Sequence, residues 1–123
     1  MSSSAAITLD VNSPIFGQRL RTLAPELIRF RREVHANPEL SYLEKKTTER
    51  IFSALTEAGL KPQHLKGTGC YVDVGEGPFA AAFRADIDAL PIQEETDLPY
   101  ASTVNGVMHA CGHDIHQTVM LGV

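Results

Sequence analysis

The stretch His109-Ala110-Cys111-Gly112-His113-Asp114-Ile115-His116-Gln117 is the part of the sequence around which the rest of the chain is organised. It holds three histidines, one of the chain's two cysteines and an aspartate. Residues two apart in an extended segment point to the same side, and Gly112 lets the backbone bend between them. Thiolates and neutral imidazoles are good ligands for zinc-like divalent metals. We therefore predict that Cys111 and His113 are metal ligands.

Two other interpretations of this stretch stay open. In the first interpretation, Cys111 is a reactive thiol paired with a histidine. In the second, it belongs to a structural metal clip, a closed site with four protein ligands. The clip is the weaker of the two, because closed sites usually take their ligands from two separated pairs and only one cluster is present. Asp114 is expected to cap the following helix or to take part in the site, and His116 to support the site or face a substrate.

A second polar cluster, Asp86 and Asp88, follows the apolar run 79–83. Such a run is typical of a central strand covered on both faces, and sites form at the carboxyl ends of strands in α/β sheets. Two aspartates two residues apart share one face of an extended segment. One carboxylate would contact a metal or its water, and the other would accept the second N–H of a ligating imidazole. The alternative is an aspartate-rich turn before Pro91.

The same region predicts a hairpin and a loop. Residues 70–74 alternate like a strand with one exposed face, and the turn 75–78 joins them to 79–83, so we expect an antiparallel pair. Cys70 would be a small core residue of the first strand. Residues 91–107 contain two prolines and few apolar repeats, and they predict a long functional loop.

Helices are predicted on both sides of this hairpin. The first would start with Pro25 in its first turn and end at Ala36, because Asn37-Pro38 cannot continue the helix. Ser41 and Glu44 form a capping-box pattern for a second helix, which Gly59 would stop in a left-handed conformation.

The two ends of the chain carry further expectations. Residues 1–13, rich in Ser and Ala, predict a mobile tail, with residues 14–123 forming the structured part. An apolar helix face begins after Asp114 and reaches the last residue, Val123, without a polar end. We therefore expect this chain to be the front part of a longer protein.

Composition narrows the class of protein. The chain has 123 residues, of which 43% are apolar and 21% charged, as in one globular domain or less. A net charge of -4 gives no support for a nucleic-acid partner. The sequence shows no secretory signal and no membrane-spanning run, so its two cysteines favour the cytoplasm. The arginines interpreted as one solvated helix face are Arg19, Arg21, Arg29, Arg31 and Arg32.

Three motifs in order carry a family resemblance. They are Phe30-Arg31-Arg32-Glu33-Val34-His35-Ala36-Asn37-Pro38-Glu39-Leu40-Ser41, Arg84-Ala85-Asp86-Ile87-Asp88-Ala89-Leu90-Pro91-Ile92-Gln93-Glu94-Glu95 and His109-Ala110-Cys111-Gly112-His113-Asp114. From about residue 20 to its end the chain resembles the amidohydrolase branch of the aminoacylase-like zinc metallopeptidases. Members of this branch include hippurate hydrolases, auxin-conjugate hydrolases and N-acetyldiaminopimelate deacetylase.

The resemblance implies a fold and an activity. The fold would be α/β, with residues 14–123 as the N-terminal portion of a zinc-peptidase-like catalytic domain that also carries a lid or dimerisation domain. The complete protein would hydrolyse the amide bond of N-acyl amino acids with two divalent metals (Zn, Mn, Ni or Co), and it would act as a homodimer. It would bind neither nucleic acid nor membranes. The alternative is a non-catalytic metal-binding or interaction module with a structural Cys/His site.

Site residues are carried over position by position. Cys111 and His113 match the first two metal ligands of the family, and Asp88 matches the aspartate that orients its site. Asp86 stands where the wider family has a histidine ligand, and it receives a supporting role. The paired glutamates and two later histidines of the family would lie beyond Val123, and Glu94-Glu95 is not that pair because it precedes the Cys/His motif. We therefore expect the chain alone to be inactive.

Overall fold

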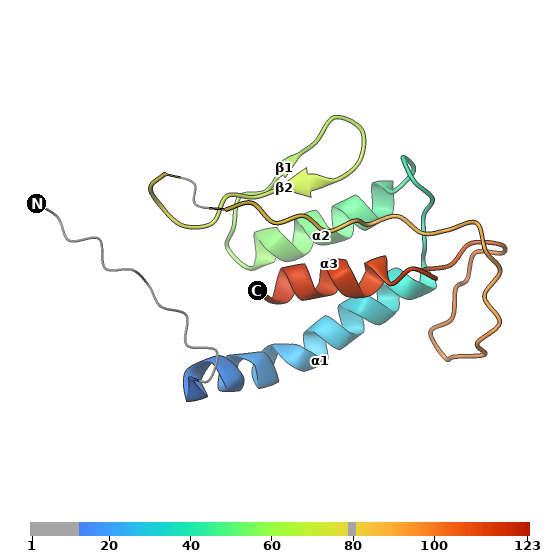
Figure 1. The fold of residues 1–123 in the computed structure, drawn as a ribbon, viewed down its shortest axis with the longest axis horizontal. Coiled ribbons are helices and arrows are strands. Elements are labelled where there is room, and N and C mark those ends of the chain that lie inside the picture. Colours follow the sequence, from blue (N-terminus) through green and yellow to red (C-terminus); the bar gives the residue numbers. More distant parts are fainter. Residues whose placement is uncertain (1–12, 79–80) are drawn as a thin grey trace, which may run out of the picture.

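The structure, a computed structural model, describes residues 13–78 and 81–123, which contain three helices and a two-stranded sheet (Figure 1). The α/β class is confirmed. The predicted tail, residues 1–13, lies outside the described residues except for Ser13. In chain order the elements are α1 (Pro14–Ala36), α2 (Lys45–Glu57), β1 (Gln63–His64), β2 (Cys70–Tyr71) and α3 (His113–Gly122).

Helix α1 starts earlier than the sequence predicted. Pro14, not Pro25, takes the first-turn position, where the missing N–H of a proline costs no hydrogen bond. Pro25 lies inside the helix, so the predicted start is wrong. A single interior proline removes one backbone bond, and the turns on either side continue. The predicted end at Ala36 is confirmed, with the Asn37 side chain donating to the Glu33 carbonyl at 2.8 Å.

Helix α2 begins at Lys45, and the predicted capping box is wrong. Glu44 is the cap residue itself and makes no side-chain capping bond; its carboxylate is buried and accepts from Thr68 Oγ1 at 2.7 Å. The carboxylate of Glu39 takes over the capping, accepting from the backbone N of Lys46 at 3.1 Å and of Thr47 at 2.6 Å. A negative charge at this end also suits the helix dipole.

The end of α2 follows the sequence prediction. Gly59 adopts a left-handed φ of 82°, which a side chain would disfavour. Its N–H donates to Thr56 O at 2.9 Å, and the N–H of Leu60 donates to Leu55 O at 3.0 Å. This pair of bonds is the Schellman arrangement, so the left-handed stop at Gly59 is confirmed.

The predicted pairing of residues 70–74 with 79–83 is wrong. Strand β2 pairs instead with β1, with Gln63 opposite Tyr71 and His64 opposite Cys70. The turn that joins these two strands lies between residues 65 and 69. Leu65 N donates to Gly69 O across it at 3.0 Å, and Gly67 and Gly69 adopt positive φ angles. Residues 79–80 lie outside the described residues, and 81–83 have no strand partner, with Phe83 81% exposed.

Residues 91–107 form no helix or strand, so the predicted loop is confirmed. Its two ends are joined by the bridge between Leu90 and Met108, and Thr103 N donates to Ala36 O at 2.9 Å. The loop is thereby held against the end of α1. In the described part of the chain, no helix has the length and apolar character needed to cross a membrane.

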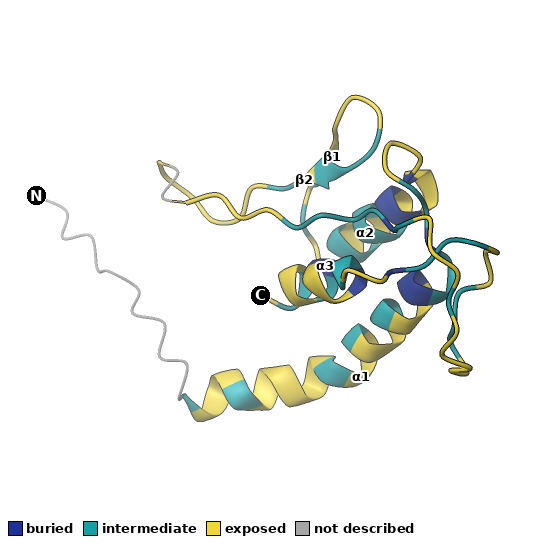
Figure 2. Cartoon of the chain, turned by 45° about the vertical axis from the view of Figure 1, so that its right-hand side comes forward, coloured by how far each residue is buried: buried dark blue, intermediate teal, exposed yellow. Residues whose placement is uncertain are grey.

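The buried side chains gather where the end of α1, the start of α2, the start of α3 and the loop meet (Figure 2). Helix α3 packs mainly against α1. Among the apolar residues described, Val34 and Ala89 are buried. The other buried positions are polar: His35, Glu44, Thr47, Thr48, His109, Asp114 and Gln117. This part of the molecule is therefore held together largely by polar contacts.

Candidate metal centre

The structure brings His113 and Asp88 together. His113 is the first residue of α3, and its Nδ1 lies 2.9 Å from both the carboxylate Oδ1 and the backbone O of Asp88. Both neighbours are acceptors, so Nδ1 carries the proton and Nε2 keeps its lone pair. A carboxylate that fixes the tautomer in this way is the usual support of a metal-binding histidine. The lone pair of His113 Nε2 is therefore free to bind another group.

Asp86 lies on the Nε2 side of this ring. Its Oδ2 is 4.0 Å from His113 Nε2, and its Oδ1 accepts from Arg84 Nη2 at 2.6 Å. The hydrogen bond from Arg84, together with its charge, lowers the pKa of the Asp86 carboxyl. The carboxylate stays ionised at neutral pH, with one oxygen bound to Arg84 and the other turned toward His113.

Gly112 sets the direction of the chain between Cys111 and His113. It has a left-handed φ of 93°, and its carbonyl accepts from the backbone N of Ile115 at 3.0 Å and of His116 at 3.1 Å. The predicted bend at Gly112 is therefore present. The helix starts at His113, so the capping role expected of Asp114 is wrong: Asp114 lies within the first turn and makes no capping bond.

The predicted ligands differ in how they are placed. The side chain of His113 is 15% exposed, and that of Asp88 26%, at an open hollow of about 430 Å³ that Asp86, Arg84 and Tyr42 also line. Cys111 is an exposed free thiol just before the helix. Among the described residues, no group of three or more His, Cys, Asp or Glu is arranged to hold a metal ion.

The residues present fit part of a metal site. His113 has a fixed tautomer and a carboxylate beside its free nitrogen. An exposed thiol, Cys111, precedes it by two residues. Imidazole, carboxylate and thiolate are donor types that divalent transition metals take. In such a site His113 and Cys111 would hold the ion, and Asp88 would orient His113.

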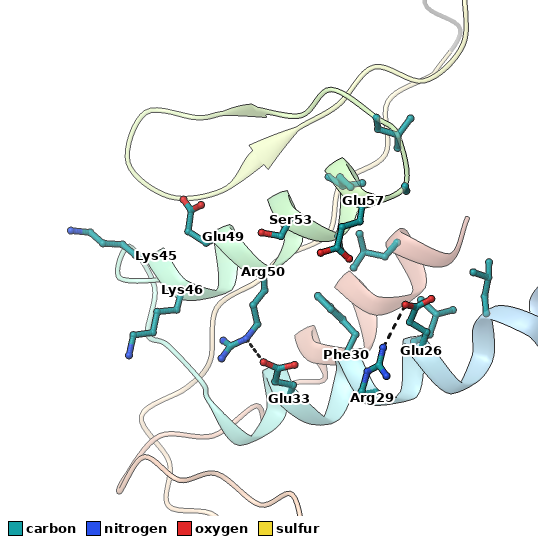
Figure 3. Close-up of a pocket in the computed structure, with 17 residues that line it drawn as sticks. Glu26, Arg29, Phe30, Glu33, Lys45, Lys46, Glu49, Arg50, Ser53 and Glu57 are labelled. Carbon is teal, nitrogen blue, oxygen red and sulfur yellow. Dashed lines mark hydrogen bonds and ion pairs between the residues drawn. The ribbon is translucent and has the colours of Figure 1, made fainter.

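A larger groove, of about 880 Å³, lies between α1 and α2 (Figure 3). It contains none of the predicted site residues. Its charged groups include two ion pairs, Arg50 with Glu33 at 3.1 Å and Arg29 with Glu26 at 3.5 Å. Because it contains no histidine or cysteine and four of its charged side chains pair with one another, this groove is a poorer candidate for chemistry than the hollow at His113.

A buried polar cluster behind His113 was not predicted. His35 Nδ1 lies 2.8 Å and Arg31 Nε 2.7 Å from Asp114 Oδ2, while His35 Nε2 lies 3.0 Å from Glu94 Oε1. Arg31 is therefore not part of a solvated face, because its charge is used inside the molecule. The available signal was the spacing of Arg31 and His35, which are four residues apart on one face of α1.

Glu94 is held ionised at the base of the loop. Burial alone would raise the pKa of its carboxyl, but hydrogen bonds from Thr96 Oγ1, His35 and Ser102 N outweigh burial and lower the pKa to about 2. The carboxylate therefore acts as an acceptor that joins the loop to α1.

His109 is buried beside this cluster, with its ring 6.4 Å from that of His35. Neither of its ring nitrogens has a partner among the described residues. Burial lowers the pKa of His109, so its ring is neutral at pH 7. His116, in contrast, is exposed, and its ring lies 5.7 Å from that of His113.

Comparison with known proteins agrees with the predicted family. Residues 82–123, which include Asp86, Asp88, Cys111 and His113, match Peptidase family M20/M25/M40. The N-acetyl-L-cysteine deacetylase of Bacillus subtilis (strain 168) is 53% identical over 84% of this chain and 26% of its own length. The IAA-amino acid hydrolase ILR1-like 2 of Arabidopsis thaliana is 46% identical over 78% of this chain and 22% of its own length.

A solved structure agrees as well. The Bacillus subtilis YXEP protein, described as a dinuclear metal binding peptidase from the M20 family, superposes with a TM-score of 0.77 at 43% identity. The match covers 82% of this chain and 29% of that one. The predicted resemblance to this family is confirmed, and the chain spans about a quarter of the length of the relatives named here.

We expect Asp88→Asn to weaken metal binding by about 10–100-fold, because a neutral amide is a weaker acceptor for the Nδ1–H of His113 than a carboxylate and makes the imidazole less basic. The affinity of the full-length gene product for Zn²⁺ can be measured by competition with a chromophoric chelator. Asp73→Asn, at an exposed position far along the chain, is the matched control. An Asp88→Asn variant with wild-type affinity would show that Asp88 does not orient a ligand.

Glu94 should make the fold sensitive to acid. Its pKa is lowered from 4.5 to about 2, so its stabilising effect is complete above pH 4.5 and is lost as the pH falls toward 2. Glu94→Gln should reduce the free energy of unfolding at pH 7 by about 1–3 kcal/mol and flatten its decline from about pH 5 to about pH 3. Urea unfolding at each pH measures both effects. The exposed neighbour variant Glu95→Gln should change neither, and equal curves for the two variants would refute this role.

Proposed function

We propose that this chain supplies part of the active site of a metal-dependent amidohydrolase that cleaves the amide bond of N-acyl amino acids. The observation that carries the proposal is the contact of His113 Nδ1 with Asp88, which leaves Nε2 free beside Asp86 in an open hollow. The names of the two relatives, a deacetylase of N-acetylcysteine and a hydrolase of IAA-amino acids, both denote this type of reaction.

In this proposal each residue has a defined task. Cys111 and His113 are metal ligands, Asp88 holds the ligand tautomer of His113, and Asp86 supports the site with a second carboxylate. The bound divalent metals, two in the complete protein and drawn from Zn, Mn, Ni or Co, would polarise the scissile carbonyl and acidify a water. The dinuclear site of the related M20 peptidase supports this number.

Solvent access favours a catalytic over a structural metal site, because a substrate must reach a catalytic metal. Structural metal sites are closed, four-ligand arrangements, whereas catalytic sites keep a position open. Cys111 is exposed, and the hollow at His113 is accessible. We place the protein in the cytoplasm, since both cysteines are free. We propose small N-acyl amino acids as its substrates and a second copy of the chain as its partner.

Cys111→Ala should abolish hydrolysis while leaving the protein folded. We expect the full-length gene product to bind about two metals per chain, and the variant to lose at least about 100-fold in kcat/KM on N-acetyl amino acids. Cys70→Ala, which changes the other cysteine in β2, is the matched control and should keep activity. Metal content, turnover and circular dichroism are measured on all three proteins.

Other outcomes would support the competing functions. Activity that resists chelators but is lost in Cys111→Ala would identify a thiol nucleophile. Unfolding on metal removal, without hydrolysis of any acyl amino acid, would identify a structural Cys/His site in a non-catalytic module.

The 123-residue chain alone should hydrolyse N-acetyl amino acids at no measurable rate, because it contains no group placed as the general base in this proposal. Incubation of the purified chain with Zn²⁺ and a panel of N-acetyl amino acids tests this. Turnover that scales with the concentration of the chain would contradict it.

A further inference from the structure

His35 contacts side chains from three parts of the chain. It lies at the end of α1, 4% exposed, with its imidazole between two carboxylates from distant segments. Nδ1 is 2.8 Å from Asp114 in α3, and Nε2 is 3.0 Å from Glu94 in the loop 91–107. One ring therefore joins three parts of the chain.

Asp114 is the member of this cluster that reaches the candidate metal centre, because it follows His113 directly. Its carboxylate is buried, and Oδ2 receives both His35 and, at 2.7 Å, Arg31. A buried carboxylate without such partners is costly, so the position of Asp114 is firmly set. Its backbone carbonyl also accepts from Thr118 Oγ1 at 2.7 Å, within the same helix.

Successive residues of an α-helix point about 100° apart around its axis. His113 is held on one side by Asp88, and Asp114 on another side by His35 and Arg31. Two contacts in different directions fix the rotation of the first turn of α3, which neither contact fixes alone. Any rotation that releases Asp114 also turns the imidazole of His113 away from Asp86 and Asp88.

We propose that His35 is a positioning residue for the metal centre: through Asp114 it fixes the first turn of α3 and so the direction in which His113 presents Nε2. His35 itself touches no metal ligand in this arrangement. The inference rests on the proposed function only in requiring that His113 binds metal. His35, in the motif 30–41, would thus position His113, in the motif 109–114.

The test uses Co²⁺ as the probe metal, because its visible absorption reports ligand geometry, and the full-length gene product. His35→Gln retains a hydrogen-bonding side chain but cannot contact the two carboxylates from opposite sides of one ring. We expect it to weaken Co²⁺ binding by about 10–100-fold and to alter the absorption spectrum. Val34→Ala, which shortens the fully buried neighbour of His35, is the control for destabilisation alone.

Val34→Ala should lower the midpoint of thermal unfolding while keeping the affinity and spectrum of the wild type. If His35→Gln behaves like Val34→Ala in all three measurements, His35 has only a structural role and the inference is wrong. If His35→Gln does not fold, Asp114→Asn, which keeps the shape of the side chain, carries the same two expectations.

His113→Ala separates this inference from the proposed function. Loss of Co²⁺ binding in His113→Ala, with wild-type binding in His35→Gln, would refute the positioning role alone. Unchanged binding in His113→Ala would refute the metal site itself, and the positioning role with it.

Discussion

The interaction on which the rest of this structure depends is the contact of the buried Asp114 carboxylate with Arg31 and His35. A carboxylate this deeply buried must be compensated by charge or hydrogen bonds, and Arg31 and His35 converge on the same oxygen, Oδ2. Removing one partner from a buried charged group typically costs about 3–5 kcal/mol. The ion pair joins α1 to α3 across 79 residues of sequence, and Glu94 extends it into the loop.

Polar groups make up most of the buried positions in the described part of the chain. Val34 and Ala89 are the buried apolar residues there. Hydrogen bonds and ion pairs are directional, while apolar burial is not. A junction of this kind therefore fixes how its elements are oriented as well as how closely they pack, and orientation is what a metal centre needs.

The candidate metal centre is coupled to the fold at two levels. Asp88 fixes the proton on His113, and the cluster behind Asp114 fixes the turn from which His113 projects. The conformation of Gly112 joins the two levels, because its left-handed φ lets the chain pass from Cys111 directly into α3. The three motifs that carry the family resemblance each contribute a residue to this assembly, namely His35, Asp88 and His113.

Local signals in the sequence were sufficient for the features that depend on a few neighbouring residues. Asn37-Pro38 predicted the end of α1, Gly59 the end of α2 and Gly112 the bend before His113, because proline and glycine restrict or free the backbone where they stand. The pairing of Asp88 with an imidazole was also foreseen as a chemical requirement of a ligating histidine.

Tertiary structure decided the features whose partners are distant. Three features differ from the local prediction. Glu39 caps α2, β2 pairs with β1, and Arg31 forms a buried ion pair with Asp114. Helix caps and charged side chains have several partners of similar energy, and the choice between them depends on which groups lose contact with water. The sequence determined which residues could take part in this site, and packing determined which of them meet.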